Sequence, residues 1–218
     1  MKVNIYIEGA SDKFAMEALL APLLEKKLQE GIAIEFFETP SGDRKKSVLT
    51  KVPQKAVNIL RNNPDSIVIA MPDLYPKNKA FPHETIDELV AGISQNFEIA
   101  LRDKGLQNDN RLRERFKVFC FKYELEALIL AAEVALQNRL GINSINRTWR
   151  IPVEDQNHDN PPKQIVEQLF KNCGKRYQET VDVPLILGSV SYQEIADKCT
   201  QCFKPFVEFI EGLQAGNL

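Results

Sequence analysis

Carboxylates stand at or just after the ends of three apolar stretches of the chain. Glu8 ends the stretch "KVNIYIE", Asp12 lies about one helical turn later, Asp73 follows "SIVIAMP", and Glu124 and Glu126 come soon after "RFKVFCF". If these stretches are adjacent parallel strands, their carboxyl ends meet at one edge of a sheet, which is where open α/β sheets bind ligands. Each of these acids alone could also be a simple helix cap.

Carboxylates that lie a few ångströms apart raise one another's pKa unless a cation compensates their charge. Ligand sets made only of oxygen favour Mg²⁺ or Mn²⁺ over zinc. A divalent ion of this kind activates water and stabilises a phosphoryl transition state. We therefore predict a metal site, with Glu8 as a ligand or general base on a rigid strand end.

The elements that must position these residues alternate along the chain. Strands are expected at 2–8, 32–38, 66–72 and 115–121, and each is followed by helical spacing of apolar residues. The third of these is almost wholly apolar, as in a parallel sheet covered on both faces. The pattern predicts an α/β fold with a mostly parallel sheet flanked by helices.

Helix boundaries are marked by glycine and proline. The first helix is expected from Ser11 to Gly31, with a kink or break at Pro22. The next is expected over about 47–62, and a third from Pro82 to Gly105. One helix is expected after the fourth strand, with Gly141 just past its end.

The remainder of the chain has a different character. Residues 146–162 are polar and rich in proline, and a long connection of this kind is often functional. A helix is expected to begin at Asn160–Pro161, and a last helix to span about 191–213. We expect an α/β core over 1–145 and an α-helical elaboration over 146–218, packed together as one domain.

A basic stretch could bind phosphate beside the predicted metal site. Residues 42–61 hold six basic side chains and one acidic one, and Lys45, Lys46 and Lys51 are the candidates for contact with a nucleic-acid backbone. The alternative is a solvated helix face. The stretch lacks the spacing of a Walker P-loop. The second basic cluster, "RLRERF" (111–116), is expected to decorate the surface before a strand.

Two motifs resemble those of the Toprim domain. "IYIEGASD" resembles its first motif, a strand ending in Glu-Gly with an acidic residue three positions after the glycine, and "IVIAMPD" resembles the approach to its second. More closely, the chain resembles a family of small stand-alone Toprim-like proteins of unknown function, often encoded beside an ATPase. The stretches "YELEALILA", "NPPKQIVEQLF" and "IADKCTQCFKPFVEFI" carry that closer match.

The resemblance implies Mg²⁺-dependent breaking or joining of phosphodiester bonds. Glu8 takes the place of the general acid/base or ligand glutamate, and Asp73 that of the first aspartate of a D-x-D pair. The second position of that pair is Tyr75, so Glu124 or Glu126 would have to supply the missing ligand. The implied function is a nuclease acting on DNA or RNA with an ATPase partner in phage defence or DNA repair. The alternative is a regulatory subunit that binds an ATPase and hydrolyses nothing.

Other candidate residues have simpler interpretations. Cys199 and Cys202 form a lone C-x-x-C, which falls short of the four ligands of a structural zinc site, so we expect packing residues. His158 is expected to be solvated, and Glu154 and Asp155 to lie in solvent and not in an outer shell of the metal.

Composition excludes some classes of protein. The 218 residues carry a net charge of −2 with a pI of about 5.8, which is not the profile of a protein that coats nucleic acid. No apolar run is long enough for a membrane helix and the start lacks a signal-peptide pattern, so we expect a cytoplasmic protein with reduced cysteines. A homo-oligomer is compatible with the sequence.

Overall fold

The computed structural model describes residues 1–155 and 160–216, and the chain forms two compact units. The first unit comprises Met1–Gly9, Leu24–Cys120 and the segment from Gly212 onward. The second comprises Ala10–Leu23 and Phe121–Glu211.

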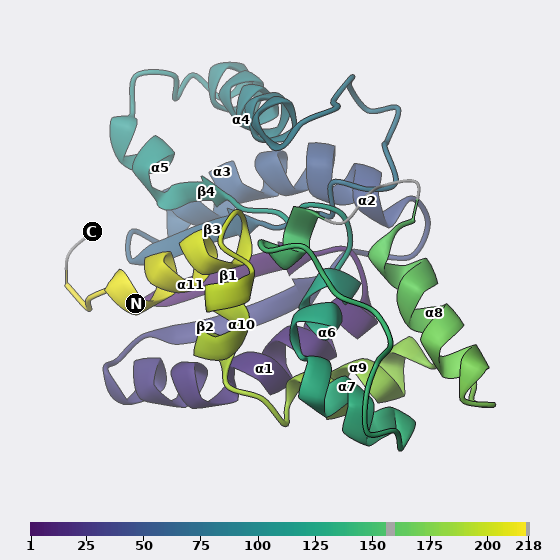
Figure 1. The fold of residues 1–218 in the computed structure, drawn as a ribbon. Helices are drawn as coiled ribbons and strands as arrows, with labels where there is room; N and C mark the ends of the chain where they lie inside the picture. Colours follow the sequence, from purple (N-terminus) through teal and green to yellow (C-terminus); the bar gives the residue numbers. More distant parts are fainter. Residues whose placement is uncertain (156–159, 217–218) are drawn as a thin grey trace. The chain divides into compact units, whose positions relative to one another are not determined.

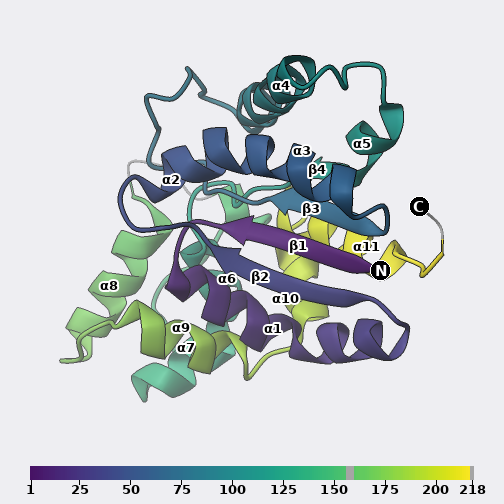
Figure 2. The ribbon, with the colours of Figure 1, turned by 180° about the vertical axis from the view of Figure 1, so that it is seen from behind.

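The first unit is built on a parallel sheet (Figure 1, Figure 2). Its strands β1 (Lys2–Ile7), β2 (Ala33–Glu38), β3 (Ser66–Ala70) and β4 (Phe116–Val118) lie in the order β2-β1-β3-β4, and every neighbouring pair is parallel. Lys2 pairs with both Ala33 and Ser66, so β1, β2 and β3 begin at the same level. The predicted mostly parallel sheet flanked by helices is confirmed, although β4 is shorter than the expected strand.

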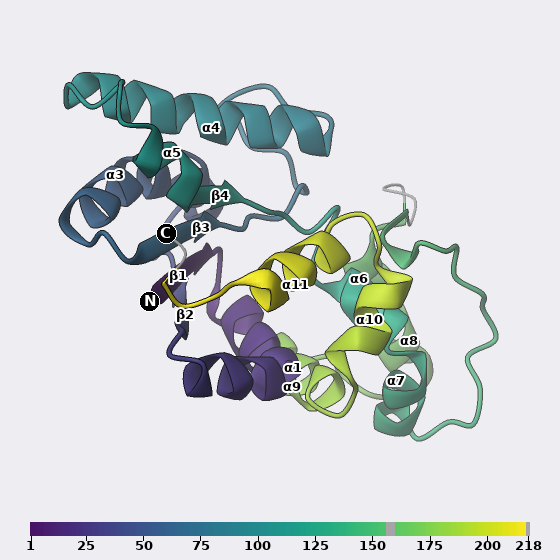
Figure 3. The ribbon, with the colours of Figure 1, turned by 90° about the vertical axis from the view of Figure 1, so that its left-hand side faces the viewer.

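Helices follow β2 and β3 in this unit. A continuous helical stretch comprises α2 (Arg44–Lys46), the π-helical turn η1 (Ser47–Lys51) and α3 (Val52–Asn62). Helix α3 packs on β3, and α4 (Ile86–Asp103) packs on α3 and β4 (Figure 3). Helix α4 begins later than the expected start at Pro82, because Thr85 and Glu88 form a reciprocal capping box that sets its first turn.

The π-helical turn results from Pro53. In an α-helix the N–H of residue 53 would bond to the Leu49 carbonyl, but proline has no N–H to give. The Val52 N–H bonds to the Ser47 carbonyl instead, and the Leu49 carbonyl accepts a hydrogen bond of 2.9 Å from Asn96 Nδ2 of α4. A side chain of α4 thus satisfies the backbone group that Pro53 leaves unpaired.

We expect the substitution Asn96→Ala to lower the free energy of unfolding by about 1–2 kcal/mol, because it leaves the Leu49 carbonyl without its donor. Urea denaturation would measure the change. The matched control is Gln95→Ala at the exposed neighbouring position, for which we expect a change within about 0.5 kcal/mol. Equal effects of the two substitutions would contradict this account.

The second unit is helical and is organised around α6 (Glu126–Ala131), all of whose residues are buried. Helix α6 packs against α7 (Glu133–Leu140), η2 (Val153–Asp155), α8 (Pro162–Asn172), α9 (Glu179–Leu187) and α10 (Tyr192–Lys198). The single helix expected after the fourth strand is therefore wrong. Ala132, with φ −84° and ψ 46°, leaves the helical conformation and separates α6 from α7.

Two prolines have opposite effects on predicted helices. Helix α1 (Ala10–Gln29) runs through Pro22 without the predicted break. The expected last helix is instead divided into α10 and α11 (Phe203–Gly212). In one continuous helix the ring of Pro205 would meet the carbonyl of Gln201, so the chain leaves the helix before α11 begins.

Within the described residues, we find no helix with the length and apolar character needed to cross a membrane.

Candidate functional site

The carboxyl edge of the sheet brings Glu8 and Asp73 together. Glu8 directly follows β1, and Asp73 follows the adjacent strand β3. The Asp73 backbone N–H donates a hydrogen bond of 3.0 Å to Glu8 Oε1. Both residues are partly exposed, so solvent reaches this pair. The two residues with the clearest motif positions are therefore neighbours, as expected for adjacent parallel strands.

Thr39 holds this edge in place and was missed in the sequence. It directly follows β2 and is 4% exposed. Its hydroxyl lies 3.0 Å from the Glu8 carbonyl and 3.2 Å from the Arg44 carbonyl, and its one proton can be donated to either. Its backbone N–H donates to the Ile7 carbonyl. Thr39 thus joins the end of β1 to the start of α2.

The predicted phosphate-binding lysines lie on the helical stretch that follows. Lys45 is 6% exposed, and its ammonium donates to the carbonyl of Pro76 in the segment after β3. Lys46 and Lys51 are exposed. Sequence patterns distinguish these side chains poorly, because the carbonyl that Lys45 binds lies 31 residues further along the chain.

Asp43 connects the same two segments. Its carboxylate accepts the Lys46 N–H at the start of α2, and Asn78 Nδ2 donates to it at 3.1 Å. These hydrogen bonds hold the pKa of Asp43 below its usual range, the Lys46 N–H having the larger effect. The segments after β2 and β3 are therefore tied together beside Glu8 and Asp73.

The other three predicted ligands belong to the second unit. Asp12 lies in the first turn of α1. Glu124 Oε2 accepts the Lys163 backbone N–H at 3.1 Å, at the start of α8. Glu126 Oε1 accepts a hydrogen bond of 3.1 Å from the Tyr177 hydroxyl. Across residues 1–155 and 160–216, no group of three or more His, Cys, Asp or Glu side chains is arranged to hold a metal ion.

Glu126 is a buried carboxyl group of this unit, and its acidity is altered. Burial raises its pKa to about 7, while the nearby Lys163 opposes this effect. The pKa of the Tyr177 hydroxyl is also raised, mainly by burial and then by the neighbouring Glu126. The contact between Glu126 and Tyr177 was missed because 51 residues separate them.

Glu154 is not in solvent, and that expectation is wrong. It is 2% exposed, and its carboxylate accepts backbone N–H groups of Gln201, Cys202 and Phe203 at the start of α11. Burial raises its pKa, and these three donors act in the opposite direction. Asp155 pairs with Lys122. His158 lies outside the described residues.

The C-x-x-C cysteines are buried in the turn that Glu154 caps. In the described part of the chain, neither Cys199 nor Cys202 forms a disulfide bond. Burial raises the pKa of the Cys199 thiol, so the group that packs there is the protonated form. Their burial agrees with the packing role expected from the sequence.

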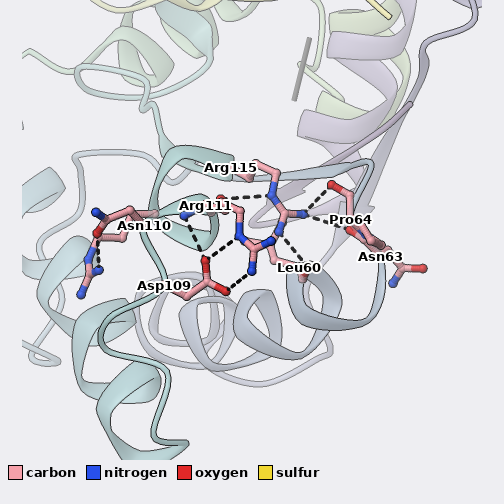
Figure 4. Close-up of polar contacts among 8 residues, drawn as sticks. Leu60, Asn63, Pro64, Asp109, Asn110, Arg111 and Arg115 are labelled. Atoms are coloured by element: carbon pink, nitrogen blue, oxygen red, sulfur yellow. Dashed lines mark hydrogen bonds and ion pairs between the residues drawn. The ribbon is translucent and has the colours of Figure 1, made fainter. Parts of the chain in front are cut away.

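The "RLRERF" cluster does not simply decorate a surface. It forms α5 (Asn110–Arg115), and Arg115 is only 8% exposed (Figure 4). The guanidinium of Arg115 donates to backbone carbonyls at 2.9–3.2 Å, and burial lowers its pKa. These acceptors are the carbonyls of Leu60, Asn63, Pro64, Ser66 and Arg111. Arg115 therefore caps the end of α3 and joins it to the start of β3.

Residues 7–211 match a family described as "Domain of unknown function (DUF4276)". The chain belongs to this family. No curated protein matches the chain. Among solved structures, the chain is similar to the C-terminal region of the Burkholderia pseudomallei OLD protein, at 15% identity, 96% coverage of each chain and a TM-score of 0.47. It is also similar to that region of the Xanthomonas campestris pv. campestris OLD protein, at 13% identity, 96% coverage of each chain and a TM-score of 0.41.

Proposed function

We propose that this member of the family is a Mg²⁺-dependent nuclease that cleaves phosphodiester bonds and works with an ATPase partner. The observation that carries the proposal is the contact between the Asp73 N–H and Glu8 Oε1 at the carboxyl edge of the sheet. The same two residues occupy the acidic positions of the Toprim-like motifs "IYIEGASD" and "IVIAMPD". The contact and the motif positions both support the proposal for this pair.

The donor set at this edge fits Mg²⁺. The ion commonly keeps several waters and takes one or two carboxylates, with substrate phosphate completing its coordination. Glu8 and Asp73 would hold it, and the bound ion would polarise a phosphoryl oxygen and activate water. Asp12, Glu124 and Glu126 remain predicted ligands, and the proposal does not depend on them.

The protein groups around this pair have distinct tasks in the proposed reaction. The Asp73 N–H fixes the orientation of the Glu8 carboxylate, and the Thr39 hydroxyl fixes the backbone that carries it. Lys46 and Lys51 are exposed, so their ammonium groups can bind phosphates of a DNA or RNA backbone. Lys45 supports the segment after β3 through Pro76.

A specific observation favours a second candidate, a non-catalytic regulatory subunit of an ATPase complex. Tyr75 stands where the second aspartate of the D-x-D pair is expected, which removes one oxygen ligand. A subunit of this kind would need Glu8 only as a turn residue.

Calorimetric titration with Mn²⁺ at neutral pH separates the two candidates. We expect the wild type to bind Mn²⁺ and Glu8→Gln to bind it at least about tenfold more weakly, because the amide loses the charge of the ligand. The matched control is Glu35→Gln, since Glu35 lies on β2 in an exposed pair with Lys2 and has no role at the edge.

Equal binding by the wild type and Glu8→Gln would overturn the metal site and favour the regulatory subunit. If the site is established, single- and double-stranded DNA and RNA should be tested as substrates, and at least one of them should be cleaved by the wild type and by Glu35→Gln, but not by Glu8→Gln. The cleavage assay should be run with and without a candidate ATPase partner.

A further inference from the structure

A cavity of about 520 Å³ lies in the first unit, away from Glu8 and Asp73. It is formed where α3 ends and α5 begins (Figure 4). Ser66 and Phe116 begin β3 and β4 beside these segments, so the cavity lies at the amino edge of the sheet. Its volume is within the range of small-molecule sites.

A buried positive charge lines this cavity. Every hydrogen-bond acceptor of the Arg115 guanidinium is a neutral backbone carbonyl, and no carboxylate among the described residues bonds to it. A guanidinium has five N–H groups. The single acceptor of Nη2 is the Leu60 carbonyl, which leaves one N–H of this nitrogen available. Buried charges in proteins are normally paired, so this arrangement is unusual.

A second guanidinium lies beside the first. Arg111 contacts Asp109 through Nε at 3.1 Å and Nη2 at 3.0 Å, and Asp109 also caps α5. This pair is close to neutral. Both members of the pair act on Arg115: burial lowers the pKa of Arg115 most, the charge of Asp109 opposes this effect, and the charge of Arg111 adds to it.

The charge balance of the lining decides which ions the cavity favours. Its remaining charged residues are Arg61, Asp65 and Glu114, all of them exposed. Exposed charges are screened by water and salt, whereas a buried charge acts at a lower effective dielectric constant. The buried cation therefore dominates inside the cavity, although the acids around it oppose the entry of a highly charged anion.

We infer that this cavity binds a small organic carboxylate with an apolar body. A carboxylate matches the planar guanidinium and carries a single negative charge. A phosphate dianion would be repelled more strongly by Asp65 and Glu114. Leu60, Leu106 and Leu112 supply the apolar part of the lining. This site would be separate from the proposed metal site, and it does not rest on the proposed function.

Calorimetric titration with benzoate at low salt tests the inference. One variant removes a positive charge from the lining of the cavity, and another removes a negative charge. We expect saturable binding to the wild type, weakened about threefold in Arg61→Gln and strengthened about threefold in Glu114→Gln. Glu25→Gln, an exposed substitution on α1 far along the chain, is the control and should leave binding unchanged. Acetate, which lacks the apolar body, and inorganic phosphate should bind more weakly than benzoate.

Three results would overturn the inference. The first is the absence of saturable benzoate binding. The second is weaker binding in Glu114→Gln, which would show that the cavity prefers cations. The third is equal binding by the wild type, Arg61→Gln and Glu114→Gln, which would show that benzoate binds elsewhere.

Discussion

Replacing Arg115 by lysine is expected to lower the free energy of unfolding by about 3 kcal/mol, the cost of leaving buried carbonyls without donors. The guanidinium of Arg115 reaches carbonyls at the end of α3, at the start of β3 and in α5 at the same time. An ammonium has three N–H groups on one atom and cannot span these acceptors, although it keeps the charge. Urea denaturation would measure the loss.

The matched control is Arg113→Lys on the same helix. Arg113 pairs with Glu98 near the surface, where both side chains are about one-third exposed. A pair of this kind contributes about 1 kcal/mol or less, so the control should change stability little. If the two substitutions had equal effects, the carbonyl contacts of Arg115 would not be the source of its contribution.

The contribution of Glu126 to the stability of the wild type is expected to fall by about 3 kcal/mol as the pH rises from 4.5 through 7, in a buffer that contains a metal chelator. Burial raises the pKa of Glu126 to about 7 from an ordinary value of 4.5. The folded state therefore keeps a proton that the unfolded state has already released, so the contribution is present below pH 4.5 and lost above pH 7. Each unit of pKa difference corresponds to about 1.4 kcal/mol.

Glu126→Gln is expected to remove most of this pH dependence, because the amide stays neutral and its oxygen still accepts the Tyr177 hydroxyl. Urea denaturation at pH 5 and pH 8 would measure it, with Glu208→Gln at an exposed position of α11 as the control. Burial also raises the pKa of Glu154, so a smaller slope of the same sign should remain. An unchanged slope in Glu126→Gln would show that Glu126 is ionised at neutral pH in the folded state.

Much of the first unit could be predicted from local patterns. Apolar runs alternating with helical spacing predicted the parallel sheet, and Gly105 adopts a positive φ just past the helix that it was expected to end. The contact between Glu8 and Asp73 also followed, because both stand where adjacent parallel strands end. In each case the signal lies in a few consecutive residues.

The helical unit was harder to predict because its boundaries depend on single residues. The apolar spacing continues through the segment that contains α10 and α11. The helix is divided there because, in a continuous helix, the ring of Pro205 would clash with the carbonyl of Gln201. In contrast, Pro22 leaves α1 intact. The same residue type therefore has different outcomes, and the surrounding packing decides between them.

The sequence alone determined which acids follow strands, which stretches are buried, and that the sheet is parallel. Only the tertiary structure decided which charged and polar side chains are buried. Arg115, Glu154 and Thr39 leave solvent because backbone groups distant in the sequence become available as partners. A charged or polar group is buried only where such partners compensate for lost hydration, and no local pattern encodes where those partners lie.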